Sequence, residues 1–425
     1  MRFSISLVLL AAIPLFSQQS TLNLTLAEAQ RLAIQNNPQF KAAGFSAAAS
    51  YQVPLQYRAG RMPTVTGAIT AVGADNGSRL AAGALNNPVV YDRLASGLIV
   101  NQLVTDFGRT SNLTESARLR AQAQDQATET TRANILIATA RAYFSVLRAR
   151  AVLTVAQETV SARQLVSDQV TALANSNLKS GLDVSFANVN LADARLLLLQ
   201  AQNDVKAAEA DLATTLGLPS QMAFSLHDEP APGPLAGDVN PLVAQALQER
   251  PELKDLRLQQ SAAERFVKAE HSLFYPNIAA AGAAGFVPVG EVAVPGRYGA
   301  IGININIPVF NGGLFRARQT EAELKAKAAN ENVNVTANNV SRDVRVAFLN
   351  AQTAFERVGL TDQLLTQARL ALDLAHGRYD LGLSSIVELS QAQLNLTSAQ
   401  IGSASAQYDY QAERAVLEYQ VGALH

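Results

Sequence analysis

The sequence predicts an α+β membrane protein made of two copies of one unit, in which a hairpin of β-strands is joined to a pair of long coiled-coil helices. Three observations support this fold class. Short motifs recur at a nearly constant spacing along the 425 residues, two very long stretches contain no proline, and short alternating segments precede each stretch. A spacing of this kind indicates a repetitive architecture and not an ordinary globular domain.

The composition excludes several classes of function. The 34 basic and 35 acidic side chains nearly cancel, and only 16% of residues are charged, so the chain lacks the basic surface that binding to nucleic acid requires. Without cysteine it can hold no disulfide, iron–sulfur cluster or catalytic thiolate. Phosphate-binding loops, zinc-protease helices and hydrolase elbows are also missing from the sequence. We therefore predict no catalytic residue, no cofactor and no metal site, and no enzymatic activity.

The first residues have the features of an export signal. A basic start at Arg2 is followed by an apolar run of secretory length and then by small and polar residues. We predict a signal peptide over residues 1–18. Beyond it, no apolar run is long enough for a membrane-spanning helix, so the chain is expected to cross a membrane only as strands.

Four landmarks define the duplication. Pro38 recurs as Pro251 and Pro63 recurs, at the same spacing, as Pro276. Further along, Phe107 is matched with Phe310, and Gly181 with Gly382, at slightly shorter spacings. The predicted organisation is a first repeat at 19–217, a proline-rich linker at 218–241 and a second repeat at 242–425.

Each repeat is expected to contain one β-hairpin. From Ile301 to Ile307 every second residue is isoleucine (Ile301, Ile303, Ile305, Ile307), whereas Asn304 and Asn306 are among the residues between them. Branched apolar side chains would therefore face lipid, and the asparagines would face a wet lumen. The predicted strands cover about 63–74, 96–106, 276–287 and 298–309.

Strands of about ten residues match tilted strands in a bilayer. Four strands cannot close a barrel, and open edges are not tolerated in lipid, so an oligomer is expected if these strands span a membrane. A soluble sheet with one wet face is the alternative.

Two long helices per repeat follow from the remaining pattern. The proline-free stretches predict helices at about 111–176 and 314–379, and heptad spacing predicts return helices at about 183–216 and 386–421. In the first return helix the heptad positions alternate large and small residues (Val184, Ala187, Leu191, Ala194, Leu198, Ala201, Val205, Ala208, Leu212). Such alternation favours close antiparallel packing. An intramolecular coiled-coil hairpin with no further role would give the same pattern.

In this order of elements the chain resembles the TolC-like outer-membrane efflux protein family. The resemblance rests on the duplication, on the strand starts at Pro63 and Pro276, and on the strand-to-helix segments 106–109 and 307–313. It implies a homotrimer whose strands form a 12-stranded β-barrel in the outer-membrane lipid, continued by a helical barrel in the periplasm. It also implies a passive exit duct of a tripartite efflux or type I secretion system, engaged by a periplasmic adaptor protein and an inner-membrane transporter.

The turns between the long helices are the candidate adaptor-docking sites. Gly181 and Gly382 are expected to stop each helix in a left-handed conformation. Leu182, Leu383 and Ser384 lie beside them, and the resemblance implies that an adaptor docks at these tips.

The resemblance also implies a gated entrance near the second tip. Two acidic positions of the family correspond here to Glu388 and Gln391, so one acid is kept. A clasp of an acid, a tyrosine and an arginine corresponds to Ala187, Tyr379 and Ser384, of which only Tyr379 matches. Asp183 is a weaker candidate for the entrance, since an acid early in a helix is favoured by the helix dipole.

A different class of function is also compatible with long heptad helices. A secreted or surface-attached coiled-coil scaffold or adhesin would space and bind partners without a channel. The isoleucine-alternating hairpins favour the duct, and a mature protein that is soluble without detergent would favour the scaffold.

Overall fold

The computed structural model describes residues 22–75, 91–219, 224–230, 232–235, 237–290 and 295–424. The predicted signal peptide, residues 1–18, lies outside them. The chain divides into two compact units: unit 1 consists of Met1–Pro38, Arg132–Val239 and Arg345–His425, and unit 2 of Gln39–Thr131 and Asn240–Val344. Each unit takes residues from both predicted repeats, so the repeat is a unit of sequence and not a compact body.

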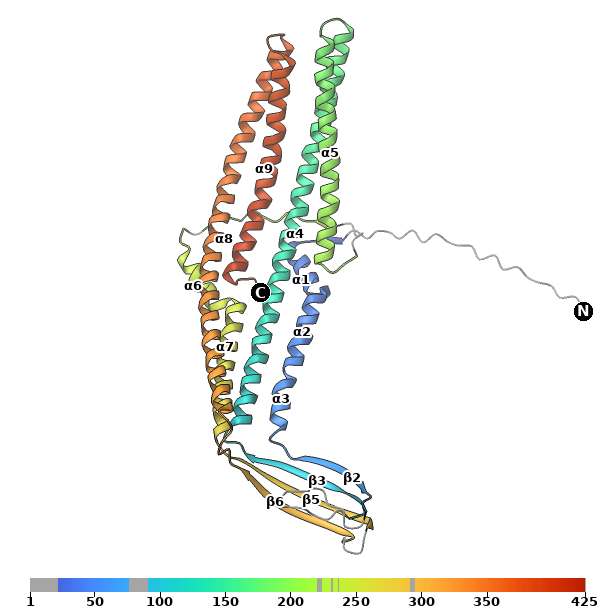
Figure 1. The fold of residues 1–425 in the computed structure, drawn as a ribbon. Helices are drawn as coiled ribbons and strands as arrows, with labels where there is room; N and C mark the ends of the chain where they lie inside the picture. The colour runs from blue at the N-terminus through green and yellow to red at the C-terminus, as the bar shows by residue number, and fades with distance from the viewer. Residues whose placement is uncertain are drawn as a thin grey trace, which may run out of the picture. The chain divides into compact units, whose positions relative to one another are not determined.

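Unit 2 contains a four-stranded antiparallel sheet in the order β2-β3-β5-β6 (Figure 1). Strands β2 and β6 are its edges, and the second strand of the first hairpin pairs with the first strand of the second hairpin. The strand bounds are Thr64–Val72 for β2, Arg93–Thr105 for β3, Asn277–Gly290 for β5 and Arg297–Asn306 for β6.

Strand β6 ends earlier than the alternation predicts. Ile307 lies beyond its last residue, Asn306, so the prediction of Ile307 as a strand residue is wrong. Pro308 follows directly, and proline has no backbone N–H to donate to a ladder. The isoleucine pattern therefore continues one residue past the last hydrogen-bonded pair.

Unit 2 also contains several shorter helices. They are α2 (Pro38–Ser50), α3 (Gln52–Ala59), α6 (Asn240–Glu249) and α7 (Pro251–His271), with the short 3-10 helix η1 (Ser272–Phe274). The long helices α4 (Arg109–Asn175) and α8 (Leu314–Asp380) have 67 residues each and pass through both units. At about 1.5 Å per residue each is about 100 Å long.

The turns from strand to long helix share one backbone conformation. Phe107 and Gly108 have φ of 54° and 94°, and Gly312 and Gly313 have φ of 63° and 86°. Phe107 is therefore equivalent to Gly312 and not, as the sequence match suggests, to Phe310. Asp106 fixes the first turn by accepting hydrogen bonds from the backbone N–H groups of Gly108 (3.2 Å) and Thr110 (2.7 Å).

In unit 2 the buried carboxylate of Glu270 connects three helices. Glu270, near the end of α7, is 1% exposed. Arg318 of α8 donates to both its oxygens at 2.7 and 3.0 Å, and Arg109 at the start of α4 lies 3.7 Å away. Burial makes a charge costly unless it is paired, so this triad fixes α7 against the starts of both long helices.

Unit 1 consists of two helical hairpins and a small parallel sheet. Helix α4 runs beside α5 (Gly181–Thr215), and α8 runs beside α9 (Ile386–Val421) (Figure 1). The heptad positions of α5 are buried or half-buried, including Ala187, Ala194, Ala201 and Ala208. Alanine at these positions allows close helix contact.

Strands β1 (Leu22–Leu24) and β4 (Phe224–Leu226) pair in parallel beside α1 (Leu26–Asn36). Strand β4 lies in the segment predicted as linker, so that segment is not featureless. Tyr143 of α4 is fully buried and donates to the carbonyl oxygens of Leu24 (3.0 Å) and His227 (2.6 Å). Burial raises the pKa of Tyr143 to about 12, which keeps this donor neutral.

Of the helices in the described ranges, none combines the length and the apolar character that a membrane crossing needs.

We expect Glu270→Gln to destabilise unit 2 by about 3 kcal/mol, because two guanidinium groups lose a buried counter-charge. Thermal unfolding followed by circular dichroism measures the loss. Glu321→Gln is the matched control, since Glu321 pairs with Lys325 on the exposed surface and such pairs stabilise little. Equal melting temperatures for the two variants would mean that the triad does not hold the helices.

Candidate functional site

The four strands of unit 2 separate apolar from polar side chains. Paired residues in an antiparallel sheet share a face, and the register aligns Val65, Val100, Gly282 and Ile301 across all four strands. The branched apolar residues on this face are Val65, Ile69, Leu98, Val100, Ile278, Ile301, Ile303 and Ile305.

The other face carries most of the polar side chains of the sheet. Its polar members include Thr64, Thr66, Thr70, Arg93, Asn101, Asn277, Asn304 and Asn306, whereas Ser96, Gln102 and Arg297 lie on the first face. On the first face Ile301 and Ile303 are 91% and 71% exposed. A monomer would leave a large apolar surface in contact with water, which indicates an interaction surface.

The ring of Tyr298 lies beside two glycine residues on the polar face of the sheet. Gly97, Gly285 and Tyr298 are neighbours in one row of the sheet. A Cβ atom on Gly285 would lie 2.6 Å from Cζ of Tyr298, so the ring fits only because the residue is glycine. An aromatic ring placed over strand glycines replaces the packing that these residues lack.

The tips of the helical hairpins turn at equivalent residues in the two copies. Asn177 (φ 57°) follows α4, and Gly382 (φ 71°) follows α8. Gly181 does not hold the left-handed position predicted for it: it is the first residue of α5, directly after the N-cap Ser180. Its equivalent is therefore Ile386 of α9 and not Gly382, because the N-cap of α9 is Ser385.

Large apolar side chains are exposed at both tips. Leu178 and Leu383 directly follow the left-handed residues and are 69% and 67% exposed. Leu182 and Leu381 are exposed as well, whereas Ser384 has a buried hydroxyl with no hydrogen-bond partner. Sequence reasoning missed Leu178, although asparagine is the second most common residue at a left-handed helix stop and could have identified this position.

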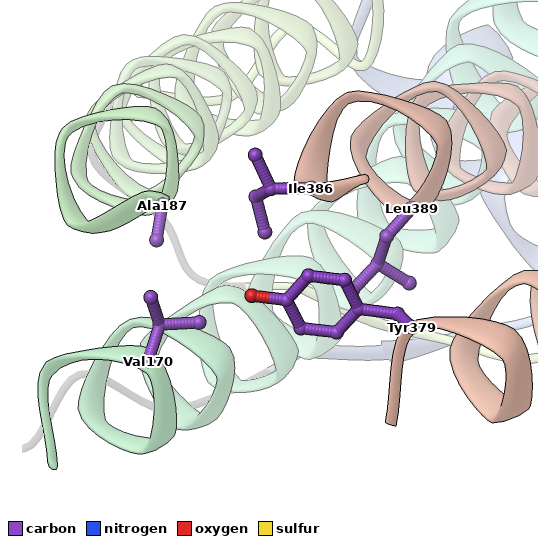
Figure 2. Close-up of a cluster of buried hydrophobic side chains, with 5 residues drawn as sticks. All are labelled: Val170, Ala187, Tyr379, Ile386 and Leu389. Carbon is purple, nitrogen blue, oxygen red and sulfur yellow. The ribbon is translucent and has the colours of Figure 1, made fainter. Parts of the chain in front are cut away.

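Tyr379 is packed into an apolar cluster formed by both hairpins (Figure 2). It comes from α8, and the other members of the cluster are Val170 of α4, Ala187 of α5, and Ile386 and Leu389 of α9. Its hydroxyl is buried without a hydrogen-bond partner, and burial raises the pKa of Tyr379. Tyr379 and Ala187 thus belong to one apolar cluster, and the proposed role of Tyr379 in a clasp stays a prediction.

A cation lies over the face of the same ring. Nζ of Lys179, in the turn between α4 and α5, is 3.7 Å from the Tyr379 ring centroid. This is a cation–π geometry, which stabilises by about 0.5–1 kcal/mol at exposed sites. Together with the apolar cluster it links the first tip to the second.

The acidic residues of the two tips differ in their contacts. Asp183 accepts hydrogen bonds from the backbone N–H (2.9 Å) and hydroxyl (2.7 Å) of Ser180, which lower its pKa and cap α5. Glu388 instead lies 3.2 Å from Nε of Arg378. Gln391 is exposed and donates to Asn395 at 3.0 Å.

We expect Tyr379→Phe to leave the melting temperature unchanged or to raise it slightly, because the variant removes a buried hydroxyl that has no partner. Tyr379→Ala should destabilise by about 3 kcal/mol, since it opens a cavity in the cluster. Thermal unfolding of both variants separates the two effects. A loss with Phe as large as that with Ala would show that the hydroxyl makes a bond in the assembled protein.

Comparison with known proteins identifies the group to which this arrangement belongs. The family described as "Outer membrane efflux protein" matches residues 29–218 and 242–423. The outer membrane protein TolC of Salmonella enteritidis is 25% identical over 423 residues, covering 94% of this chain and 84% of that protein. The toluene efflux pump outer membrane protein TtgC of Pseudomonas putida is 28% identical, covering 69% and 61%.

Solved structures share the fold. The outer-membrane channel OprN superposes with a TM-score of 0.82 at 20% identity, over 94% of this chain and 90% of that one. The outer membrane protein VceC of Vibrio cholerae superposes with a TM-score of 0.80 at 21% identity, over 93% and 96%. Since the family match covers most of both predicted repeats, the chain belongs to the outer membrane efflux protein family.

Proposed function

We propose that three copies of the chain assemble into one exit duct of the outer membrane, with the strands forming a 12-stranded barrel and the helices a tunnel through the periplasm. Such a duct is passive and serves a tripartite efflux or type I secretion system. A signal peptide at residues 1–18 would direct the chain to export.

The observation that carries this proposal is the combination of an apolar sheet face with two open edges. Within the part of the chain that the structure describes, strands β2 and β6 are each paired on one side only. In lipid, an unpaired backbone N–H or C=O group costs several kcal/mol, so strands span a bilayer only when the sheet is closed. Pairing of β6 with β2 of the next copy satisfies both edges without any further element.

The two faces then have different environments. Ile301, Ile303 and Ile305 face lipid, and Asn304 and Asn306 face the lumen, where their amides keep water in the pore. Ile307 follows the strand, at the level where the chain leaves the sheet.

The tips of the hairpins are the proposed docking surface for a periplasmic adaptor protein, through which an inner-membrane transporter is recruited. Leu182, Leu383, Gly181, Gly382 and Ser384 belong to this surface, and Leu178 joins it because of its exposure beside the first turn. Exposed leucines at tight turns offer apolar contact to a partner.

The entrance is proposed to lie near the second tip. Glu388 and Gln391 would line it, and three copies of Glu388 around one axis would attract cations. Asp183 contributes through the cap of α5. Because Ala187 and Ser384 cannot form a charged clasp with Tyr379, the apolar cluster of Tyr379 takes its place as one of the contacts that hold the hairpins together near the tips.

We expect Ile303→Lys to reduce the amount of trimer in the outer membrane severely, because a lysine near the bilayer midplane costs about 2–4 kcal/mol in each subunit. Asn304→Lys is the matched control: its side chain would point into the lumen, so assembly persists and single-channel currents shift toward anion selectivity. Membrane fractionation, native mass in detergent and planar-bilayer recording measure these effects. Equal tolerance of both lysines, or a mature protein soluble without detergent, would favour the scaffold over the duct.

We expect Glu388→Ala to weaken the block of single-channel current by multivalent cations. Arg378→Ala should strengthen it, because the carboxylate loses its counter-charge. Glu321→Ala, in unit 2, is the control and should leave the block unchanged. Unchanged current and unchanged cation sensitivity in Glu388→Ala would remove this residue from the gate.

A further inference from the structure

A cavity of about 150 Å³ lies within unit 1, between α4 of the first hairpin and α8 and α9 of the second. Helix α4 contributes Thr159 and Arg163, α8 contributes Leu372, and α9 contributes Gln393, Thr397 and Gln400. Ala162 and Leu396 also line it, so the cavity combines an apolar surface with several polar side chains.

Arg163 is the buried charge of this cavity. The residue is only 4% exposed, and its Nη1 atom is buried with no hydrogen-bond partner. Burial lowers the pKa of the guanidinium, and the acid that opposes this effect, Asp193, has an exposed side chain. Arginine nevertheless remains protonated in proteins, so a positive charge stays in the cavity.

A buried charge of this kind requires a counter-charge. Removing an arginine from water costs several kcal/mol, which an uncharged cavity does not return. Glu158 also lines the cavity, but its side chain is exposed. The hydroxyls of Thr159 and Thr397 donate to the carbonyl oxygens of Val155 and Gln393 in their own helices.

Two amide groups complete the set of donors. The side chains of Gln393 and Gln400 line the same cavity from α9. An amide NH₂ group and a guanidinium both donate hydrogen bonds, and together they match a small anion that accepts from several directions. A volume of 150 Å³ holds a halide ion with ordered water, since one water occupies about 30 Å³ in the liquid.

We propose that the cavity at Arg163 binds a small inorganic anion of the size of chloride, which neutralises the guanidinium and stabilises the contact of α4 with α8 and α9. This site differs from the tips, the entrance and the strand faces, and it does not depend on the duct. Anion binding to the purified protein is measured without any channel activity, so it fails or succeeds independently of the proposed function.

The direct test is a crystal of the full-length mature protein grown in bromide. Anomalous scattering should place a bromide ion at the Arg163 guanidinium, within hydrogen-bond distance of Gln393 or Gln400. In solution, replacing gluconate by chloride at constant ionic strength should raise the melting temperature by about 2 °C, because a ligand that binds the folded state stabilises it.

Arg163→Leu should abolish this chloride dependence. Arg195→Gln is the matched control, since Arg195 is an exposed arginine of α5 that donates to Gln164 (2.8 Å), and it should keep the full dependence. If Arg163→Leu does not fold, the bromide experiment on the unsubstituted protein still tests whether an anion binds at Arg163. An empty bromide map at Arg163, or a chloride effect that persists in Arg163→Leu, would overturn the proposal. A chloride effect that is absent from the unsubstituted protein and appears only in Glu158→Gln would assign the counter-charge to that carboxylate and would overturn the proposal equally.

Discussion

The backbone of the strands imposes the main constraint on this protein. Every second residue of β2 and β6 directs its backbone N–H and C=O groups to the outer side of the sheet, and in the described ranges no further strand pairs with them. In water these groups bind solvent, but in lipid they have no such partner. In a bilayer, a sheet with two open edges therefore needs further strands to complete it, and the proposed assembly of copies supplies them.

The duplication lets one chain supply two hairpins to the sheet. One hairpin supplies two strands, and the pairing of β3 with β5 joins the two hairpins through the longest ladder of the sheet. Both strands of this inner junction belong to one chain, so in the proposed assembly only the pairing of β2 with β6 depends on association between copies. Small side chains on β5, such as Ala280, Gly282 and Ala284, leave room for the larger residues of β3 and β6 on the same face.

Most of the fold could be predicted from periodicity, because long regular elements repeat their signal many times. Alternation over Ile301–Ile305 and heptads over α5 and α9 each extend over several turns or pairs, so local exceptions do not hide them. Features that depend on a single residue, such as a left-handed helix stop, are not repeated along the sequence and so give no periodic signal. The left-handed position was assigned to Gly181 because glycine is the usual residue there, whereas Asn177 holds it in the structure.

Contacts between distant segments also could not be predicted from one sequence. The ion pairs of Glu270 join α7 to residues on two other helices, and Tyr143 reaches the carbonyl of His227 across 84 positions. Nothing in the local sequence of either residue indicates a partner. The strands β1 and β4 have three residues each, too few for an alternation to be recognised.

Three charged residues are deeply buried in the described ranges, namely Arg163, Arg250 and Glu270, and the differences between them support the assignment of an anion to Arg163. Arg250 donates to Glu252 at 2.8 Å. Glu270 is paired by Arg318 at 2.7 and 3.0 Å and approached by Arg109 at 3.7 Å, so its charge is balanced within unit 2. Arg163 is buried to a similar extent in unit 1, but its Nη1 atom has no partner and it faces a cavity of about 150 Å³. A purely structural charge needs no empty volume beside it, since its partner fills the space. A cavity together with an unbalanced charge is therefore best explained by a ligand that supplies both the missing volume and the missing charge.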